Sequence, residues 1–169
     1  RALITGGSGI LGQAVAARLL KQGFETALWG QNPDRLVEAA KNLRADPKSR
    51  QIFTQAFDLS DGEALEKNLS ALKSEFGPID TLIHLAHPSV GSLNVSDSQF
   101  PALLMQHLSA SVLSFSRVLA SVLPSMIETG HGSIVAVLSQ YIMDTPPEML
   151  GAYVCSKEAL WGLIKSVAV

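Results

Sequence analysis

Short segments rich in β-branched and apolar residues alternate with segments of helical periodicity along the whole chain. This alternation is typical of βαβ units, in which a helix connects two parallel strands. We therefore expect an α/β fold with a doubly wound parallel sheet, formed by one domain over residues 1–169. The predicted strands are 1–5, 24–29, 51–57, 79–86 and 133–139. The predicted helices are 10–22, one opening at 32–33, one from 60–63 to before 77, about 100–128, and about 149 onward.

Local signals indicate where these helices begin and which side of them is buried. Leu11, Val15 and Leu19 recur at helical spacing, so we expect them to form the buried face of the first helix. The pair Asn32-Pro33 fits the cap and the first position of the second helix. The segment Ser60–Glu63 has the spacing of a capping box and predicts the start of the third helix.

The most specific local motif is the glycine-rich turn Thr5–Gly12, which follows a predicted strand and opens a predicted helix. Gly7, Gly9 and Gly12 match the G-x-G-x-x-G pattern in the context where that pattern binds dinucleotides. Glycine lets backbone N–H groups approach a pyrophosphate, and the helix N-terminus adds about half a positive charge. A turn selected only for its backbone conformation is the alternative; we favour dinucleotide binding on a Rossmann-like, three-layer αβα fold. The expected cofactor contacts here are Gly6, Gly7, Ser8, Gly9, Ile10, Leu11 and Gly12.

The end of the second strand usually distinguishes the two nicotinamide cofactors. An acid there binds the ribose 2′-hydroxyl of NAD, whereas a basic residue nearby accommodates the 2′-phosphate of NADP. The segment Trp29–Asn32 contains neither an acid nor a base. Because no carboxylate would repel a phosphate, we expect NADP or NAD with NADP slightly favoured, and a cofactor contact from Gln31. Arg35 on the next helix could turn in toward this position, but we expect a solvated side chain.

Tyr153 and Lys157 lie four residues apart in the predicted final helix, so their side chains share one face and can address one site. Ser139 ends the predicted fifth strand. Together with the glycine turn, these residues resemble the short-chain dehydrogenase/reductase superfamily, in order and over essentially all 169 residues. The resemblance implies an NAD(P)-dependent oxidoreductase. It extends to Asp58-Leu59, which look like the family's adenine-contacting Asp and its neighbour.

The resemblance also implies a chemical role for each residue. Tyr153 would act as general acid or base on the carbonyl or alcohol oxygen while hydride moves to or from nicotinamide. Lys157 would favour the phenolate and bind the nicotinamide ribose, so Tyr153 and Lys157 are expected cofactor contacts as well as catalytic residues. Ser139 would hold the substrate oxygen. A tyrosine that packs at a helix start beside a solvated lysine is the alternative.

The chain departs from the family pattern at three places. The fourth strand ends with His84–His87 where the family commonly has Asn-Asn-Ala-Gly, so Ala86 alone remains there as an expected cofactor contact. Ser111 stands where a helix asparagine supports a proton relay, which makes it a candidate catalytic residue without the amide. The glycine spacing resembles the family's extended branch. A catalytically weak nucleotide-binding module that acts as sensor or scaffold therefore stays open, with a methyltransferase on a similar sheet ranked third.

Two histidines and one cysteine invite other chemistry. His84 and His87 are three residues apart at a strand end, so their side chains should point to opposite faces, and no third ligand is evident. We expect a structural or cofactor-contacting role for both and no metal site. Cys155 is the only cysteine, which rules out an internal disulfide and fits a cytoplasmic location. We expect it to be a small buried packing residue.

Composition limits the classes of partner. The chain is 47% hydrophobic, with a formal net charge of −2 and no basic stripe, so we expect a packed core and no nucleic acid partner. We see no apolar run near the roughly 18 residues of a membrane span and expect no membrane. The substrate would be a small-molecule carbonyl or alcohol. Apolar residues along 100–128, with the final helix, fit the homo-dimer or homo-tetramer interface common in this family. Both chain ends look cut, so we expect closing strands beyond residue 169.

Overall fold

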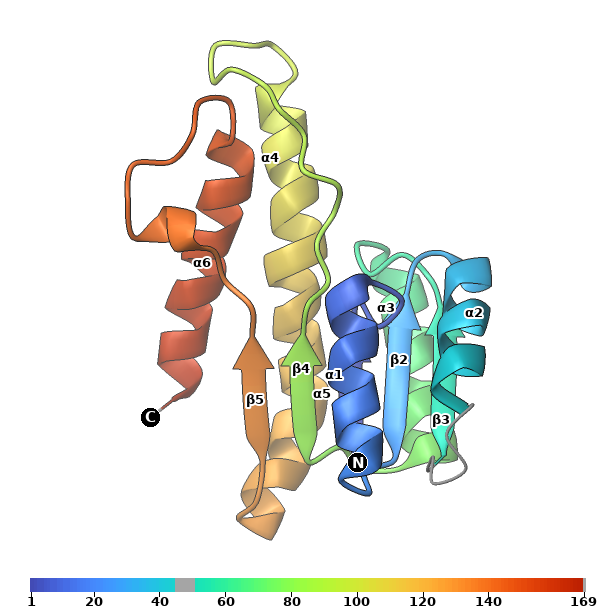
Figure 1. Ribbon diagram of the computed structural model, residues 1–169. Coiled ribbons are helices and arrows are strands. Elements are labelled where there is room, and N and C mark those ends of the chain that lie inside the picture. Colours follow the sequence, from blue (N-terminus) through green and yellow to red (C-terminus); the bar gives the residue numbers. More distant parts are fainter. Residues whose placement is uncertain (45–50, 169) are drawn as a thin grey trace.

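Five parallel strands form a sheet at the centre of the computed structural model, which describes residues 1–44 and 51–168 (Figure 1). Their order across the sheet is β3-β2-β1-β4-β5. The strands are β1 (Ala2–Thr5), β2 (Thr26–Gly30), β3 (Ile52–Ala56), β4 (Thr81–His84) and β5 (Ser133–Ala136). Every predicted strand is present, although the ends shift by up to three residues. The predicted parallel, Rossmann-like α/β architecture is therefore confirmed.

Helices cover both faces of this sheet (Figure 1). The helices are α1 (Ile10–Lys21), α2 (Pro33–Arg44), α3 (Gly62–Ala71), α4 (Phe100–Leu108), α5 (Ser114–Thr129) and α6 (Gly151–Val167). Short helical turns extend or connect them: the π-helical η1 (Leu72–Phe76) and η2 (Ser109–Leu113), and the 3₁₀ turn η3 (Gln140–Ile142). One face of the sheet packs against α1 and α2, and the opposite face packs against α3, α5 and α6.

The side chains of the central strands alternate between two hydrophobic clusters. In β1, Leu3 lies in the cluster with α3 and α5, whereas Ile4 lies in the cluster with α1 and α2. In β2, Trp29 and Leu28 divide in the same way. Because both faces of the sheet are buried, these strands are apolar throughout instead of alternating with polar residues.

The strands end together at one edge of the sheet. Thr5 at the end of β1 is in register with Trp29 in β2 and with His84 at the end of β4. The segments that follow these strands therefore leave from the same edge. Since β1 lies between β2 and β4, the order reverses here, and such a switch point is where doubly wound sheets bind ligands.

The long helix predicted for 100–128 runs through α4, η2 and α5, and ends where Gly130 takes a left-handed conformation with φ of 63°. Contrary to our expectation from the sequence, the stretch Phe100–Thr129 is long and apolar enough to cross a membrane by length and composition. Core helices pass the same test. Here Phe115, Val118 and several residues further along α5 pack into the hydrophobic cluster on the sheet.

The predicted buried face of α1 is wrong. The residues of α1 that are buried are Gly12, Ala16 and Leu20. Leu11 is 52% exposed, and its predicted companions Val15 and Leu19 are only partly buried. Small residues at the first two turns let the helix axis approach the sheet closely, so the larger side chains flank the contact instead of forming it.

Two helix starts can be compared with their predicted caps. The side chain of Asn32 accepts a 2.9 Å hydrogen bond from the backbone N–H of Arg35, which confirms the cap of α2. At α3, however, the cap is Asp61, whose Oδ1 accepts from the N–H of Glu63 at 3.0 Å. The predicted cap at Ser60 is therefore wrong by one residue: the helix is capped one residue later, because Ser60 bonds to Asp58 instead of to the helix.

Candidate active site

The turn between β1 and α1 depends on glycine for its shape. Gly6 has a φ of +72°, in the left-handed region that favours glycine. A Cβ on Gly7 would lie 2.9 Å from the Cβ of Leu28, and a Cβ on Gly12 would lie 2.8 Å from the Cα of Gly7. These positions let α1 start directly against the sheet, with its unpaired N–H groups near the strand ends.

A cavity of about 540 Å³ lies at this edge of the sheet. The expected cofactor contacts that line it are Gly6, Ser8, Gly9, Gln31, Asp58, Leu59 and Ala86. Six other expected contacts are not among its lining residues: Gly7, Ile10, Leu11, Gly12, Tyr153 and Lys157. Gly7 and Gly12 pack within the turn, whereas Ile10 is 90% exposed. The fold therefore places seven of the expected cofactor contacts around one cavity, and it uses Gly7 and Gly12 for close packing within the turn.

A polar network fixes the end of the cavity near β2. Gln31 donates a 2.9 Å hydrogen bond from Nε2 to Oδ2 of Asp58. The other carboxylate oxygen of Asp58 accepts from the backbone N–H of Ser60 at 2.8 Å and from its hydroxyl at 2.7 Å. Asp58 is thus held in place by three bonds, and Gln31 reaches it across two neighbouring strands.

Arg35 supplies positive charge to the same end of the cavity. Its side chain was expected to be solvated, and it is exposed, but it also lines the cavity. Gly30 keeps the adjacent wall open, because a Cβ there would lie 2.9 Å from Oγ of Ser8. Among the described residues that line the cavity, Asp58 is the only carboxylate and Arg35 the only guanidinium.

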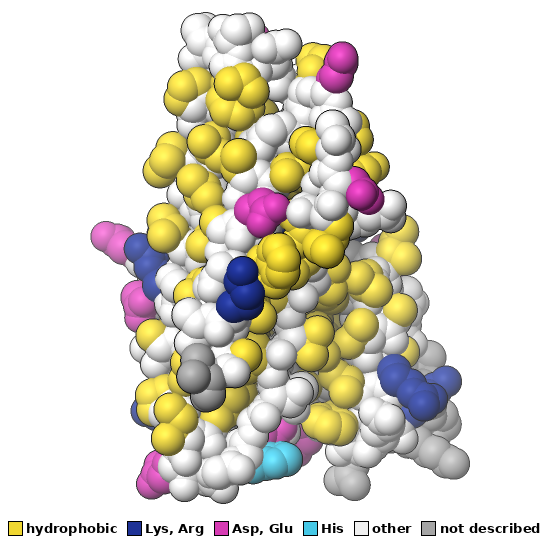
Figure 2. Space-filling view, turned by 90° about the vertical axis from the view of Figure 1, so that its left-hand side faces the viewer, with side chains coloured by type: hydrophobic (Ala, Val, Ile, Leu, Met, Phe, Trp, Pro, Cys, Tyr) yellow, Lys and Arg dark blue, Asp and Glu magenta, His cyan; other side chains and the backbone are white. Residues whose placement is uncertain are grey.

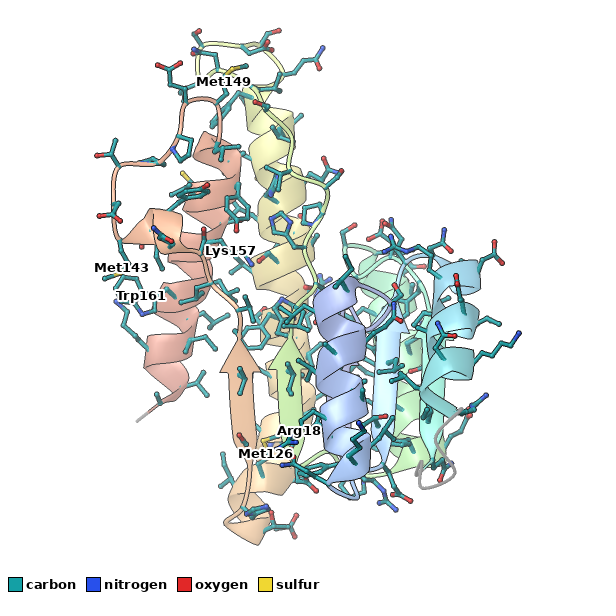
Figure 3. The ribbon with its side chains drawn as sticks, viewed as in Figure 1. Arg18, Met126, Met143, Met149, Lys157 and Trp161 are labelled. Atoms are coloured by element: carbon teal, nitrogen blue, oxygen red, sulfur yellow. The ribbon has the colours of Figure 1, made fainter. Side chains whose placement is uncertain are left out.

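Tyr153 and Lys157 lie one turn apart on α6, as predicted. Lys157 is 5% exposed, and its Nζ donates a 2.9 Å hydrogen bond to the carbonyl oxygen of Val137, just after β5 (Figure 3). The same Nζ lies 5.9 Å from the centroid of the Tyr153 ring. Burial lowers the pKa of Lys157 to about 8, so the ammonium remains the main form at neutral pH.

Ser139 follows β5 and begins η3, which packs against α6. Its Oγ accepts a 3.2 Å hydrogen bond from the backbone N–H of Tyr141, which uses one of the two lone pairs of the hydroxyl. The hydroxyl proton therefore stays available for donation. The residue is half-buried.

His84 ties three elements together beneath this site. Its Nδ1 pairs with Oγ1 of Thr5 at 2.8 Å, and its Nε2 lies 3.0 Å from the carbonyl oxygen of Ser111, to which it can only donate. Burial, followed by the charge of Lys157, lowers the pKa of His84 to about 3. His84 is therefore a neutral structural link between β1, β4 and η2.

His87 and His107 form a ring cluster with Tyr153 that sequence reasoning did not identify. The ring centroid of His87 is 4.8 Å from that of Tyr153 and 5.1 Å from that of His107. Burial lowers the pKa of both histidines, and that of His87 falls to about 4. The available signal for His107 was its position one helical turn before Ser111, on the same face of the long helix.

Several polar atoms in this cluster have no hydrogen-bond partner within the described ranges. They are Nε2 of His87, Nδ1 and Nε2 of His107, and Oγ of Ser111. Ser111, the residue predicted to take part in a proton relay, is fully buried, and its hydroxyl has no hydrogen-bond partner among the described residues. Each buried polar atom without a partner lowers the stability of the fold by about 1–3 kcal/mol. The cluster therefore carries a cost in stability that packing alone does not explain.

Cys155 lies between Tyr153 and Lys157 in sequence but not in the site. It is exposed, so the expectation that it is a buried packing residue is wrong. Positions two residues apart face different sides of a helix, and α6 turns Tyr153 and Lys157 inward. No group of three potential metal ligands occurs in residues 1–44 and 51–168.

Comparison with known proteins places this geometry in a family. The family described as short chain dehydrogenase matches residues 1–169. This chain belongs to the short-chain dehydrogenase family. The earlier resemblance is thereby confirmed, and with it membership of an oxidoreductase family whose relatives bear the names of dehydrogenases.

Individual family members resemble the chain along nearly its whole length. It is 32% identical over 160 residues to 2,3-dihydro-2,3-dihydroxybenzoate dehydrogenase of Bacillus subtilis, covering 94% of this chain and 59% of that protein. The structure of NAD⁺-bound xylitol dehydrogenase superimposes with a TM-score of 0.88 at 29% identity, covering 99% and 63%. L-sorbose reductase from Gluconobacter frateurii, complexed with NADPH and L-sorbose, gives 0.89 at 25% identity, covering 99% and 62%.

The chain spans a little over half the length of three curated relatives that it matches, between 53% and 59% of each. The matched part of this short-chain dehydrogenase includes the glycine turn, the cavity and the Tyr153–Lys157 pair. Activity, substrate and assembly of the whole protein are therefore taken up as proposals.

Proposed function

We propose that this short-chain dehydrogenase is an NAD(P)-dependent oxidoreductase that interconverts a carbonyl and an alcohol. One observation carries the proposal: a buried ammonium, that of Lys157, lies 5.9 Å from the ring of Tyr153 and is anchored to the strand that leads to Ser139. Burying a cation costs free energy unless it is paired. The ammonium of Lys157 pairs with one carbonyl oxygen, and we infer that its charge acts on the neighbouring phenol, which exchanges a proton with the substrate.

The residues at the carboxyl edge fit a nicotinamide dinucleotide. The cradle of Gly6 and Gly9 leaves room for a pyrophosphate at the start of α1. Asp58 and Leu59 would contact the adenine, while Ala86 would lie along the sugar-phosphate chain. Lys157 would bind the nicotinamide ribose. When bound, the cofactor supplies or accepts the hydride.

The side chains of α6 and η3 would handle the proton and the substrate oxygen. Tyr153 donates its hydroxyl proton to a carbonyl oxygen in reduction and takes the alcohol proton in oxidation. The Lys157 ammonium stabilises the phenolate form of Tyr153. Ser139, whose hydroxyl proton is free for donation, orients the substrate oxygen. Ser111 would take part in proton supply.

For the cofactor we propose NADP in preference to NAD. Gln31 and Asn32 follow β2 without a carboxylate, and the guanidinium of Arg35 reaches the cavity beside them. Both carboxylate oxygens of Asp58 accept hydrogen bonds, from Gln31 and from Ser60, which offsets part of its negative charge. The similar solved structures carry NAD⁺ in one case and NADPH in another, which supports a nicotinamide cofactor of either type.

We also propose that the chain forms a single dinucleotide-binding domain in the cytoplasm. Its substrate would be a small molecule, and neither nucleic acid nor membrane would be a partner. Copies of the chain would form a homo-dimer or homo-tetramer through the long helix and α6. Figure 2 shows hydrophobic side chains spread over the face that includes α6 and the β5 edge. Met105 on α4 and Leu113 on η2 are 56% and 47% exposed. Such apolar exposure supports association between copies of the chain.

Titration with NADPH and NADH, followed by turnover on a panel of carbonyl compounds, tests the function. Replacement Tyr153→Phe should retain cofactor affinity and lose at least about 100-fold in kcat, the range expected for a positioned acid–base group. Tyr141→Phe is the matched control, since Tyr141 is the other tyrosine of the chain and is 39% exposed. Full activity of Tyr153→Phe would contradict the mechanism.

A second candidate function is a nucleotide-binding module that senses redox state or acts as a scaffold. It is favoured by the serine at position 111, whose hydroxyl makes no bond within the described chain, in place of an amide. Tight cofactor binding without turnover on any carbonyl would select this candidate.

A further inference from the structure

His87 lies between the Tyr153 phenol and the cofactor cavity. Its ring meets that of Tyr153 edge-on, with centroids 4.8 Å apart and planes at 79°. The same residue lines the cavity and is only half-buried. One side of the imidazole therefore faces the proposed acid–base group while the other is accessible from the cavity.

The two nitrogens of His87 differ in their surroundings. Nε2 is buried and has no partner among the described residues. The backbone of Pro88 favours protonation of the ring, and because Nε2 is unpaired we assign the N–H of the neutral ring to Nδ1. A neutral imidazole carries one N–H and one lone pair. His87 accordingly presents a bare lone pair at Nε2 on its buried side.

His107 packs behind His87 on α4. The two ring centroids are 5.1 Å apart, and His107 is fully buried with neither nitrogen paired in the described part of the chain. Its ring is also 6.4 Å from that of Tyr153. A small rotation of either ring would give His87 a hydrogen-bond partner that holds its orientation.

Burial first, and then the charge of Lys157, lowers the pKa of both rings and keeps them neutral. Lys157 and Tyr153 face them from α6, and His84 faces them from β4. The Lys157 ammonium opposes protonation of all three histidines. An imidazole that stays neutral can accept a proton at one nitrogen and release one from the other without a lasting charge.

We propose that His87 relays the proton of Tyr153 to water at the cavity and that His107 positions His87 for this step. The inference rests on the proposed acid–base role of Tyr153. Nε2 has no partner among the residues that this structure describes, so a rotation of the rings must first bring it to the hydroxyl of Tyr153. In alcohol oxidation, the O–H bond of Tyr153 then breaks as an N–H bond forms at Nε2, and the Nδ1–H proton passes to water. A half-turn of the ring, or the reverse reaction, restores the first tautomer. His87 thereby shares with Ser111 the task of proton supply.

Buffer rescue tests the relay. In weakly buffered solution, His87→Ala should lose about 100-fold in kcat, the lower end of what proton-transfer groups contribute, and added imidazole should restore it in a saturable manner. His107→Phe should lose about tenfold without imidazole rescue, since it only positions the relay. His131→Ala is the matched control, because His131 is exposed at the turn before β5.

Two results would overturn the relay. One is a loss in His87→Ala that imidazole does not restore, which a merely structural role would give. The other is wild-type turnover in His87→Gln, a variant that keeps hydrogen-bonding capacity but cannot pass a proton through its ring.

A spectroscopic readout separates the relay from the function on which it rests. Failure of the wild-type protein to turn over any carbonyl would contradict the proposed function. In that case ¹⁵N NMR of the histidines still decides the relay. The Nε2 resonance of His87 should show a bare nitrogen whose shift changes in Tyr153→Phe, whereas an unchanged shift would overturn the inference.

Discussion

Lys157 donates a 2.9 Å hydrogen bond from Nζ to the carbonyl oxygen of Val137, which joins α6 to the segment after β5. This single bond fixes the position of the ammonium relative to Tyr153 on one side and Ser139 on the other. It also means that the charge is buried with one protein acceptor, so its removal should affect chemistry more than folding.

Replacement Lys157→Met should therefore lower kcat by at least about 100-fold while leaving the melting temperature at pH 7 no lower than that of the wild type. Methionine fills a similar volume, and the substitution removes a buried charge that burial penalises. Thermal unfolding and steady-state turnover measure the two effects. A large fall in melting temperature would show instead that the bond to Val137 is mainly structural.

The pKa of Lys157 predicts how that comparison changes with pH. Burial lowers the pKa from 10.5 to about 8, so between these values the unfolded chain binds more protons here than the folded chain. Stability at this position consequently rises with pH through that window. Any stability advantage of Lys157→Met at pH 7 should shrink between pH 8 and pH 10 in denaturant titrations. An advantage that stays constant would contradict the shifted pKa.

His84 predicts a loss of stability in acid. Its pKa falls from 6.5 to about 3 in the fold. As the pH drops below 6.5, His84 therefore becomes protonated in the unfolded chain but stays neutral in the folded chain. The stability is present above pH 6.5, and a loss on the order of 2 kcal/mol is expected by pH 5. Urea unfolding at pH 7 and pH 5 measures it. In His84→Phe this pH dependence should be clearly smaller, whatever the stability at pH 7.

The space around two glycines, Gly12 in the glycine turn and Gly162 on α6, predicts opposite effects of a Gly→Ala substitution on stability. At Gly12 an added Cβ would meet the carbonyl oxygen of Gly6 and lie 2.8 Å from the Cα of Gly7, so Gly12→Ala should destabilise by about 1–3 kcal/mol and weaken cofactor binding. The control is Gly162 on α6, where a Cβ meets nothing within 4 Å. Gly162→Ala should stabilise by about 0.5–1 kcal/mol. Equal unfolding midpoints for the two variants would refute the close-packing account.

The position of Arg35 at the cavity predicts that this residue sets the preference for NADPH over NADH. Its guanidinium at the cavity is expected to pair with a 2′-phosphate, so Arg35→Ala should weaken NADPH binding about 10- to 100-fold, as for a hydrogen bond to a charged group, and leave NADH binding unchanged. Lys41→Ala serves as control, because Lys41 is exposed on the same helix but does not line the cavity. Nicotinamide fluorescence gives both affinities. An equal loss for the two cofactors would remove Arg35 as the determinant.

Local sequence determined the order and kind of the elements, the glycine turn and the placing of Tyr153 and Lys157 on one face of α6. The strand–glycine turn–helix of Thr5–Gly12 and the spacing of Tyr153 and Lys157 act within one or two turns of chain, so their geometry follows from backbone preferences and helical periodicity. The cap of Asn32 on α2 is confirmed for the same reason.

Tertiary structure decided what lies against what. Leu11 turned outward because Gly12 let α1 approach the sheet, and Cys155 turned outward because Tyr153 and Lys157 faced the core. His87 and His107 met Tyr153 only when the end of β4, α4 and α6 came together at the sheet edge. Such contacts join residues 20 to 66 positions apart, and no local periodicity encodes them, because they arise from the packing of whole elements on a common sheet.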